Sequence, residues 1–100
     1  MNYMLEYRSR KATVNEIEQE SVSHVTAQNE KAGNKRIPEV PLGFANASWE
    51  QFKTQIQEGD EIWYADHQWG PLCGWGGWLL VRRNNQGKEY VAANMTVRIS

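Results

Sequence analysis

The sequence has only one cysteine, no long hydrophobic run and no excess of charge of either sign. Each of these features argues against one class of protein. A single cysteine cannot form an intramolecular disulfide, the cross-link that small secreted domains usually need. No segment approaches the roughly 20 apolar residues of a membrane-spanning helix. The N-terminus reaches a charge at Glu6 without an apolar signal-peptide segment. We therefore expect a cytoplasmic protein with no membrane partner.

Charge is balanced along the chain, with 11 lysines and arginines against 12 aspartates and glutamates. A protein attracted to a nucleic-acid backbone needs a concentrated positive field, so the composition disfavours a nucleic-acid partner. The glycine-rich run 74–77 lacks the Lys-Ser/Thr of a P-loop and the spacing of a dinucleotide fingerprint. The acidic residues and histidines follow no established metal-ligand spacing. The sequence therefore predicts neither a cofactor nor a metal.

Signals for the two ends of a long helix are present in the first half of the chain. Thr13 and Glu16 have the spacing of a capping box, and Gly33 is placed to end the helix in a left-handed conformation. These signals predict a helix over residues 14–32. Because several residues in its second half are poor helix formers, a strand over 21–27 is the alternative.

A second, shorter helix is predicted in the middle of the chain. Ser48 and Gln51 repeat the capping-box spacing. Apolar side chains recur from Trp49 onward at helical spacing, and Gly59 is placed to end the helix. We therefore expect a helix over residues 48–58.

Four segments are predicted to be strands, the first and last from the alternation of apolar and polar side chains and the second from apolar side chains on both of its faces. They are expected at residues 3–7, 60–66, 78–82 and 90–99. The turn sequence at 84–87, Asn-Asn-Gln-Gly, predicts a hairpin between the last two. The expected fold class is α+β, a small twisted antiparallel sheet of about four strands with one or two helices on one face, and an SH3-like small barrel with a preceding helix is the alternative. We expect a single domain over 1–100, in which 1–47 carries a strand, helix and connector, and 48–100 carries a helix and the sheet core.

Residues 59–82 hold four of the five tryptophans, five of the eight glycines and the only cysteine. Large apolar side chains beside permissive backbone predict two strands that flank a shaped loop. Trp69 and Trp75 fall in this loop, outside any periodic pattern, and aromatic residues are enriched at protein interfaces. We expect them to form an exposed patch that contacts a protein partner or a second copy of the chain. The same patch is expected to include four polar neighbours: His67, Gln68, Arg82 and Arg83.

A cysteine nucleophile is the enzymatic alternative. Asp66, His67 and Cys73 supply a carboxylate that could orient an imidazole and an imidazole that could activate a thiol. Against this, a lone cysteine beside apolar and glycine neighbours is more often a small buried side chain, and small domains rarely assemble a complete catalytic set. The sequence therefore favours a protein that is not an enzyme. A small hydrolase, or a protein that binds a small molecule with these three residues, stays the alternative.

The second half of the chain contains three blocks in order: Ser48-Trp49-Glu50-x-Phe52-Lys53, Gly59-Asp60-Glu61-Ile62-Trp63 and Leu72-x-Gly74-x-x-Gly77-x-x-Leu80-Val81-Arg82. These blocks resemble a group of small bacterial proteins to which no activity is assigned, over Ser48 to about Met95. Members of that group have a basic residue where Trp75 stands, which places a polar role of that position in doubt. The resemblance implies a bacterial origin and a shared core. Together with the tryptophans, it leads us to expect a bacterial binding module of the inhibitor, immunity or accessory type that acts by protein–protein contact.

Overall fold

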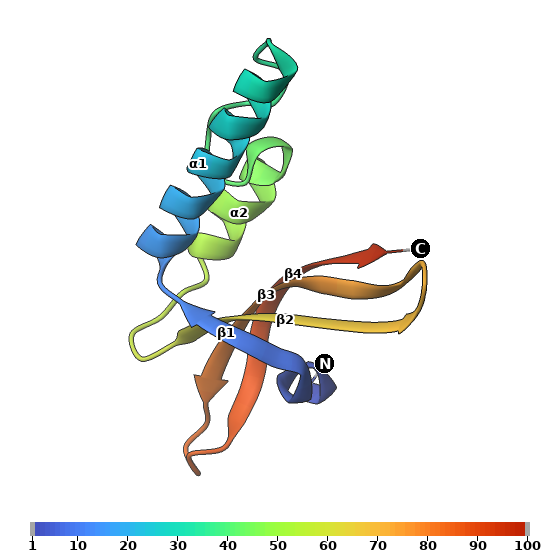
Figure 1. Cartoon of the computed structure of the whole chain (residues 1–100). Helices are drawn as coiled ribbons and strands as arrows, with labels where there is room; N and C mark the ends of the chain where they lie inside the picture. Colours follow the sequence, from blue (N-terminus) through green and yellow to red (C-terminus); the bar gives the residue numbers. More distant parts are fainter. Residues whose placement is uncertain (1, 100) are drawn as a thin grey trace. The chain divides into compact units, whose positions relative to one another are not determined.

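The computed structural model describes residues 2–99 and divides the chain into two compact units (Figure 1). The sheet unit comprises Met1–Ala12 and Gln55–Ser100, and the helical unit comprises Thr13–Thr54. Along the chain the elements are η1 (Asn2–Tyr7), β1 (Arg8–Ala12), α1 (Val14–Ala32), η2 (Gly43–Ala45), α2 (Asn46–Lys53), β2 (Glu61–Gly70), β3 (Cys73–Arg83) and β4 (Glu89–Ile99). The predicted α+β class is confirmed. The expected internal boundary at residue 47 falls inside α2, whereas the two units meet at 12/13 and 54/55.

The sheet is antiparallel and open, with the strands in the order β1-β2-β3-β4. It is therefore not the small barrel considered as the alternative. The register places Tyr64 of β2 opposite Trp78 of β3, and Trp78 opposite Met95 of β4. Because directly opposite residues of neighbouring strands point to the same side, these three residues share one face of the sheet, here called the second face. The turn predicted at residues 84–87 is confirmed, since Gly87 has a φ of 78° and donates to the carbonyl of Asn84.

The other face of the sheet is covered by η1 and carries the core of the sheet unit. Met4 of η1 is buried among five residues of the strands: Ala65, Trp75, Leu79, Val81 and Val91. We call this the η1 face. The strand predicted at residues 3–7 is wrong, because these residues form a 3-10 helix. Three residues per turn bring Met4 and Tyr7 to the same side, and both then pack on the sheet.

The helical unit is built on α1, and its predicted capping is confirmed. The amide of Glu16 donates to Thr13 Oγ1 at 3.1 Å, and the amide of Thr13 donates to Glu16 Oε1 at 3.0 Å. Gly33 ends the helix with a φ of 75°. The strand considered at residues 21–27 is therefore excluded, since burial of Val25 and other apolar side chains outweighs weak local helix propensity.

The second predicted helix is displaced and shortened. α2 begins at Asn46 and is preceded by Ala45, which makes no side-chain cap. Ser48 lies inside the helix and does not cap it. The helix ends at Lys53, well before Gly59, which instead has a φ of 88° in the turn that leads into β2. Among the described residues, no helix is long and apolar enough to cross a membrane.

Candidate functional site

The segment predicted to be a tryptophan- and glycine-rich loop is a β-hairpin. Trp69 lies near the end of β2 and Trp75 lies near the start of β3, with Pro71 and Leu72 forming the turn between them. The loop prediction is therefore wrong. The glycines of this segment had favoured a loop, yet the strand itself requires a glycine at position 77. The φ of Gly77 is 153°, and a Cβ there would overlap the carbonyl oxygen of Met95 in β4.

Trp75 is buried on the η1 face, with 8% of its surface exposed. Two tyrosines of η1 meet its indole edge-on. The ring of Tyr3 lies 6.3 Å away and that of Tyr7 5.9 Å away, centroid to centroid. Such edge-to-face pairs stabilise beyond the area that they bury. Trp75 therefore anchors η1 and offers little surface to a partner.

Trp69 extends this ring cluster to the surface. The imidazole of His67 stacks on Tyr7 at 4.2 Å and lies 5.7 Å from the ring of Trp69. Trp69 itself is 53% exposed, and Tyr3 at the opposite end of the cluster is also more than half exposed. We call the five rings the aromatic patch: Tyr3, Tyr7, His67, Trp69 and Trp75. Sequence reasoning missed both tyrosines as site residues, because the alternation of Tyr3, Leu5 and Tyr7 predicts a strand where the structure has a 3-10 helix.

The turn between β2 and β3 carries a further exposed apolar residue, Leu72. Leu72 is 72% exposed, and Cys73 beside it is a free, exposed thiol. The side-chain amide of Gln68 donates to the carbonyl of Pro71 at 3.2 Å. Gln68, which the sequence predicted to contact a partner, thus stabilises the turn.

The two arginines predicted in the patch lie elsewhere. Arg82 and Arg83 end β3, and the strand's 11 residues separate them from the hairpin turn by roughly 30 Å. Arg82 forms a bidentate pair with Asp60, with Nε–Oδ1 at 2.9 Å and Nη2–Oδ2 at 2.8 Å. The guanidinium lowers the pKa of Asp60 below its usual value, and Asp60 raises the pKa of Arg82. Arg83 is exposed beside Glu89. The structure therefore separates both arginines from the tryptophans.

The residues of the enzymatic alternative are not assembled. Asp66 and His67 are adjacent in β2, so their side chains point to opposite faces of the sheet. The imidazole of His67 is stacked on Tyr7, and Cys73 is paired with Gly70 at the turn. Asp66 cannot orient the imidazole from the other face. No group of three or more metal-ligating side chains occurs among residues 2–99.

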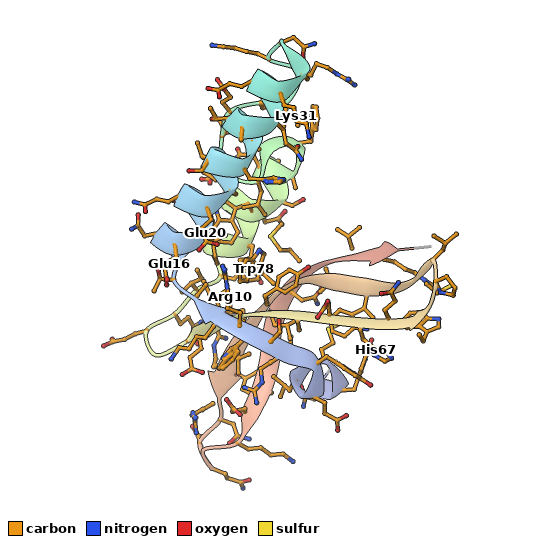
Figure 2. All side chains as sticks on the ribbon, in the orientation of Figure 1. Arg10, Glu16, Glu20, Lys31, His67 and Trp78 are labelled. Atoms are coloured by element: carbon orange, nitrogen blue, oxygen red, sulfur yellow. The ribbon has the colours of Figure 1, made fainter. Side chains whose placement is uncertain are left out.

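A groove on the second face was not predicted from the sequence. It has a volume of about 330 Å³ and is lined by Ser9, Arg10, Tyr64 and Trp78. The rings of Tyr64 and Trp78 meet at 5.2 Å and 75°, and the Arg10 guanidinium lies 5.7 Å from the indole centroid. Figure 2 places Arg10 and Trp78 together, with His67 further along β2. The signal in the sequence was weak, because it depends on the strand register that puts Tyr64 opposite Trp78.

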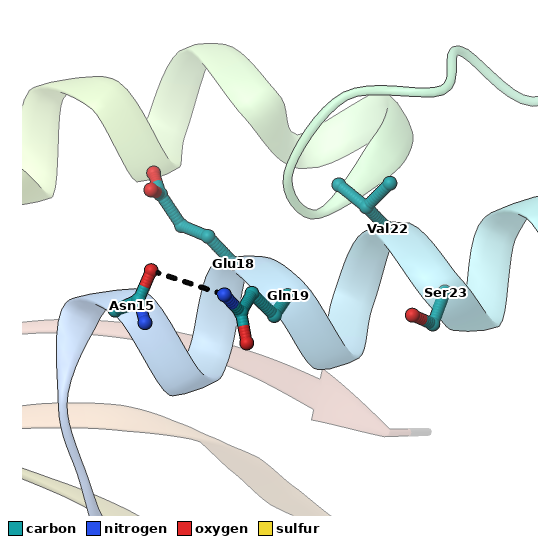
Figure 3. Close-up of a pocket in the computed structure, with 5 residues that line it drawn as sticks. All are labelled: Asn15, Glu18, Gln19, Val22 and Ser23. Atoms are coloured by element: carbon teal, nitrogen blue, oxygen red, sulfur yellow. Dashed lines mark hydrogen bonds between the residues drawn. The ribbon is translucent and has the colours of Figure 1, made fainter.

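The helical unit has a shallow hollow of about 500 Å³ along α1 (Figure 3). It is lined by Asn15, Glu18, Gln19, Val22 and Ser23. The carboxylate of Glu18 is already engaged, because it accepts from Lys53 Nζ at 2.6 Å and from the indole of Trp49 at 2.9 Å. These two bonds, that of Lys53 first, lower the pKa of Glu18. The hollow is thus the outer side of a packing contact between α1 and α2.

Comparisons with protein-family models, with curated proteins and with solved structures find no match to this chain. The resemblance of residues 48–95 to small bacterial proteins therefore stays a prediction.

Proposed function

We propose that the chain is a non-enzymatic binding module that holds a partner protein with the tip of the β2–β3 hairpin. The observation that supports this is the exposure of Trp69 and Leu72, each more than half accessible, at the end of an ordered hairpin. Exposed apolar side chains that cluster on a small domain indicate an interaction site. Trp and Tyr are also the residues that contribute most to protein interfaces.

The aromatic patch supports the hairpin before any partner binds. Tyr7 stacks on His67, and His67 contacts Trp69, so the exposed indole rests on rings that are fixed to the core through Trp75. A side chain that is already ordered loses little conformational entropy on binding. The proposed contact surface consists of Trp69, Leu72, Tyr3 and His67, and it replaces the predicted set that included the two arginines.

The exposed rings and the balanced charge favour a protein partner, and the resemblance adds only a bacterial origin. A bacterial inhibitor, immunity or accessory protein acts by occupying a surface of another protein, which requires no catalytic set. The formal net charge of −1 provides no strong field for a nucleic acid. The groove at Tyr64 and Trp78, whose rings meet at 5.2 Å, favours a small-molecule site at a different place from the one predicted at Asp66, His67 and Cys73.

The proposal is tested by identifying partners captured from bacterial lysate by cross-linking, and then measuring the affinity of the purified pair by calorimetry. Trp69→Ala is expected to weaken binding by about 2 kcal/mol or more, roughly 30-fold in Kd. Phe44→Ala is the matched control, since Phe44 is an exposed aromatic residue of the helical unit. Circular dichroism verifies that both variants fold. Equal affinities for wild type and Trp69→Ala, or a loss confined to Phe44→Ala, would contradict the proposal.

A further inference from the structure

The two edges of the sheet differ in how they are protected. An exposed edge strand presents unpaired backbone groups that can pair with another chain, and proteins protect such edges with short strands, charges and irregularities. β1 has all three features. It has five residues, its pairing with β2 shifts between Arg8 and Arg10, and three of its residues are cationic: Arg8, Arg10 and Lys11.

β4, the other edge, is protected only in its first half. Asn2 of η1 accepts a hydrogen bond from the amide of Val91 at 3.2 Å, and the pairing with β3 shifts between Leu80 and Val81, opposite residues 91–93. The second half differs. From Asn94 to Val97 the strand has no charge and no proline, and Arg98 follows. Among the described residues, no hydrogen bond from outside the strand pairing reaches the backbone of residues 95–98.

One apolar side chain of this unprotected half also lacks a cover. Val97 is 70% exposed on the second face because the residue opposite it in β3 is Gly76, which has no side chain. Met95, on the same face, lies opposite Trp78. A strand that paired with the free edge of β4 could place an apolar side chain against Val97, whereas β3 places only Gly76 there.

We propose that the chain forms a homodimer in which β4 pairs antiparallel with β4 of a second copy, about a twofold axis at Thr96. This register places Val97 opposite Met95 of the partner subunit, and Thr96 opposite Thr96 of the partner subunit. Thr–Thr is a favourable cross-strand pair, and Val97 against Met95 of the partner subunit buries apolar surface on both sides. Arg98 faces Asn94 of the partner subunit, so no like charges meet. The pairing joins two four-stranded sheets into one and contains no residue of the aromatic patch.

A second copy fits this edge because the edge is complementary to itself. Antiparallel pairing about Thr96 extends from Ala93 to Ile99 and so ends before Val91, whose amide donates to Asn2. A twofold axis at Arg98 would instead put the two guanidinium groups opposite each other. The interface is therefore isologous, which is the commonest arrangement of soluble dimers.

Sedimentation equilibrium of the full chain over micromolar to millimolar concentration tests the dimer. Wild type is expected to dimerise, and Val97→Lys, which adds an edge charge, is expected to raise the dissociation constant at least about tenfold. Val40→Lys is the control, because Val40 is exposed in the helical unit. A wild type that is monomeric throughout, or a Val97→Lys variant that dimerises as wild type does, overturns the proposal.

The register is tested by disulfide formation in a Cys73→Ser background. Thr96→Cys is expected to give a disulfide-linked dimer on mild oxidation, since directly opposed Cβ atoms lie about 4.5–5.5 Å apart, near disulfide range. Val97→Cys should cross-link poorly, because its copies lie diagonally, about 7–8 Å apart. Ser9→Cys on the protected edge is the control. Preferential cross-linking of Val97→Cys, or equal cross-linking of Ser9→Cys, overturns the pairing at Thr96.

Discussion

The phenol ring of Tyr7 stacks on the imidazole of His67, with 4.2 Å between ring centroids and 29° between ring planes. Tyr7 is the last residue of η1, and His67 lies in β2 next to the exposed end of the hairpin. This contact therefore connects the element that covers the core to the strand that carries Trp69. The order of the proposed contact surface depends on this stack.

Replacing Tyr7 tests that connection. Tyr7→Ala removes the stack on His67 and the edge contact with Trp75, and we expect it to lower the free energy of unfolding by about 2 kcal/mol. Amide exchange in β2 near Trp69 should also become faster. Denaturant titration and hydrogen exchange measure the two effects. Tyr7→Phe keeps the ring and should resemble wild type, whereas a loss equal to that of Tyr7→Ala would assign the effect to the hydroxyl.

The Asp60–Arg82 pair predicts a dependence on acid. The pKa of Asp60 is lowered in the folded protein. The ionised carboxylate therefore contributes its full stabilisation above the unfolded pKa of about 4, and this stabilisation is lost as pH falls from there through the folded pKa. Asp60→Asn cannot take up this proton. The stability advantage of wild type over Asp60→Asn should therefore shrink as pH falls from 6 to 3. Urea titrations at several pH values measure the difference, and an advantage that grows in acid would contradict the prediction.

Gly77 is predicted to tolerate no side chain. A Cβ at this position would overlap Met95 O and lie 2.7 Å from Thr96 Cα, and the φ of 153° is unfavourable for other residues. Gly77→Ala must therefore disturb the pairing of β3 with β4, and we expect a loss of about 2–3 kcal/mol. Gly70→Ala is the matched control, since its nearest neighbour would lie at an ordinary 3.6 Å. Thermal unfolding of the two variants should separate them clearly.

Helix capping gives a paired prediction in the helical unit. Thr13→Ala removes the side chain that accepts from the amide of Glu16, and we expect it to cost about 1 kcal/mol. Ser48→Ala is the control, because Ser48 has the same sequence spacing and does not cap α2. Chemical denaturation followed by circular dichroism compares the two. A larger loss for Ser48→Ala would contradict the observed start of α2.

Much of the architecture could be predicted from local signals. Thr13, Glu16 and Gly33 define both ends of α1, because capping chemistry depends only on neighbours in sequence. The long alternation of apolar and polar side chains that ends near Ile99 predicts β4, because this pattern too is local in sequence. The exposure of Trp69 is also predicted, but its support is not, since Tyr7 stacks on the neighbouring His67 only through the tertiary packing of η1.

The wrong predictions have physical causes. Tyr3, Leu5 and Tyr7 alternate as a strand does, yet a 3-10 turn buries Met4 instead. The glycines at 74, 76 and 77 suggest a loop, but in β3 they allow neighbouring strands to approach closely. The groove at Tyr64 and Trp78 and the separation of Arg82 from the patch both depend on strand register. Register is a non-local property that one short motif does not determine.

The helical unit, Thr13–Thr54, interrupts the chain between two strands that are direct neighbours, since Ala12 pairs with Ile62. It is thus inserted into a β-hairpin. During synthesis β1 leaves the ribosome long before β2 exists to pair with it, whereas α1 and α2 can pack as soon as residue 54 is free. The edge of β1 stays unpaired until β2 has been synthesised. Its three cationic residues disfavour pairing with other nascent chains during that time.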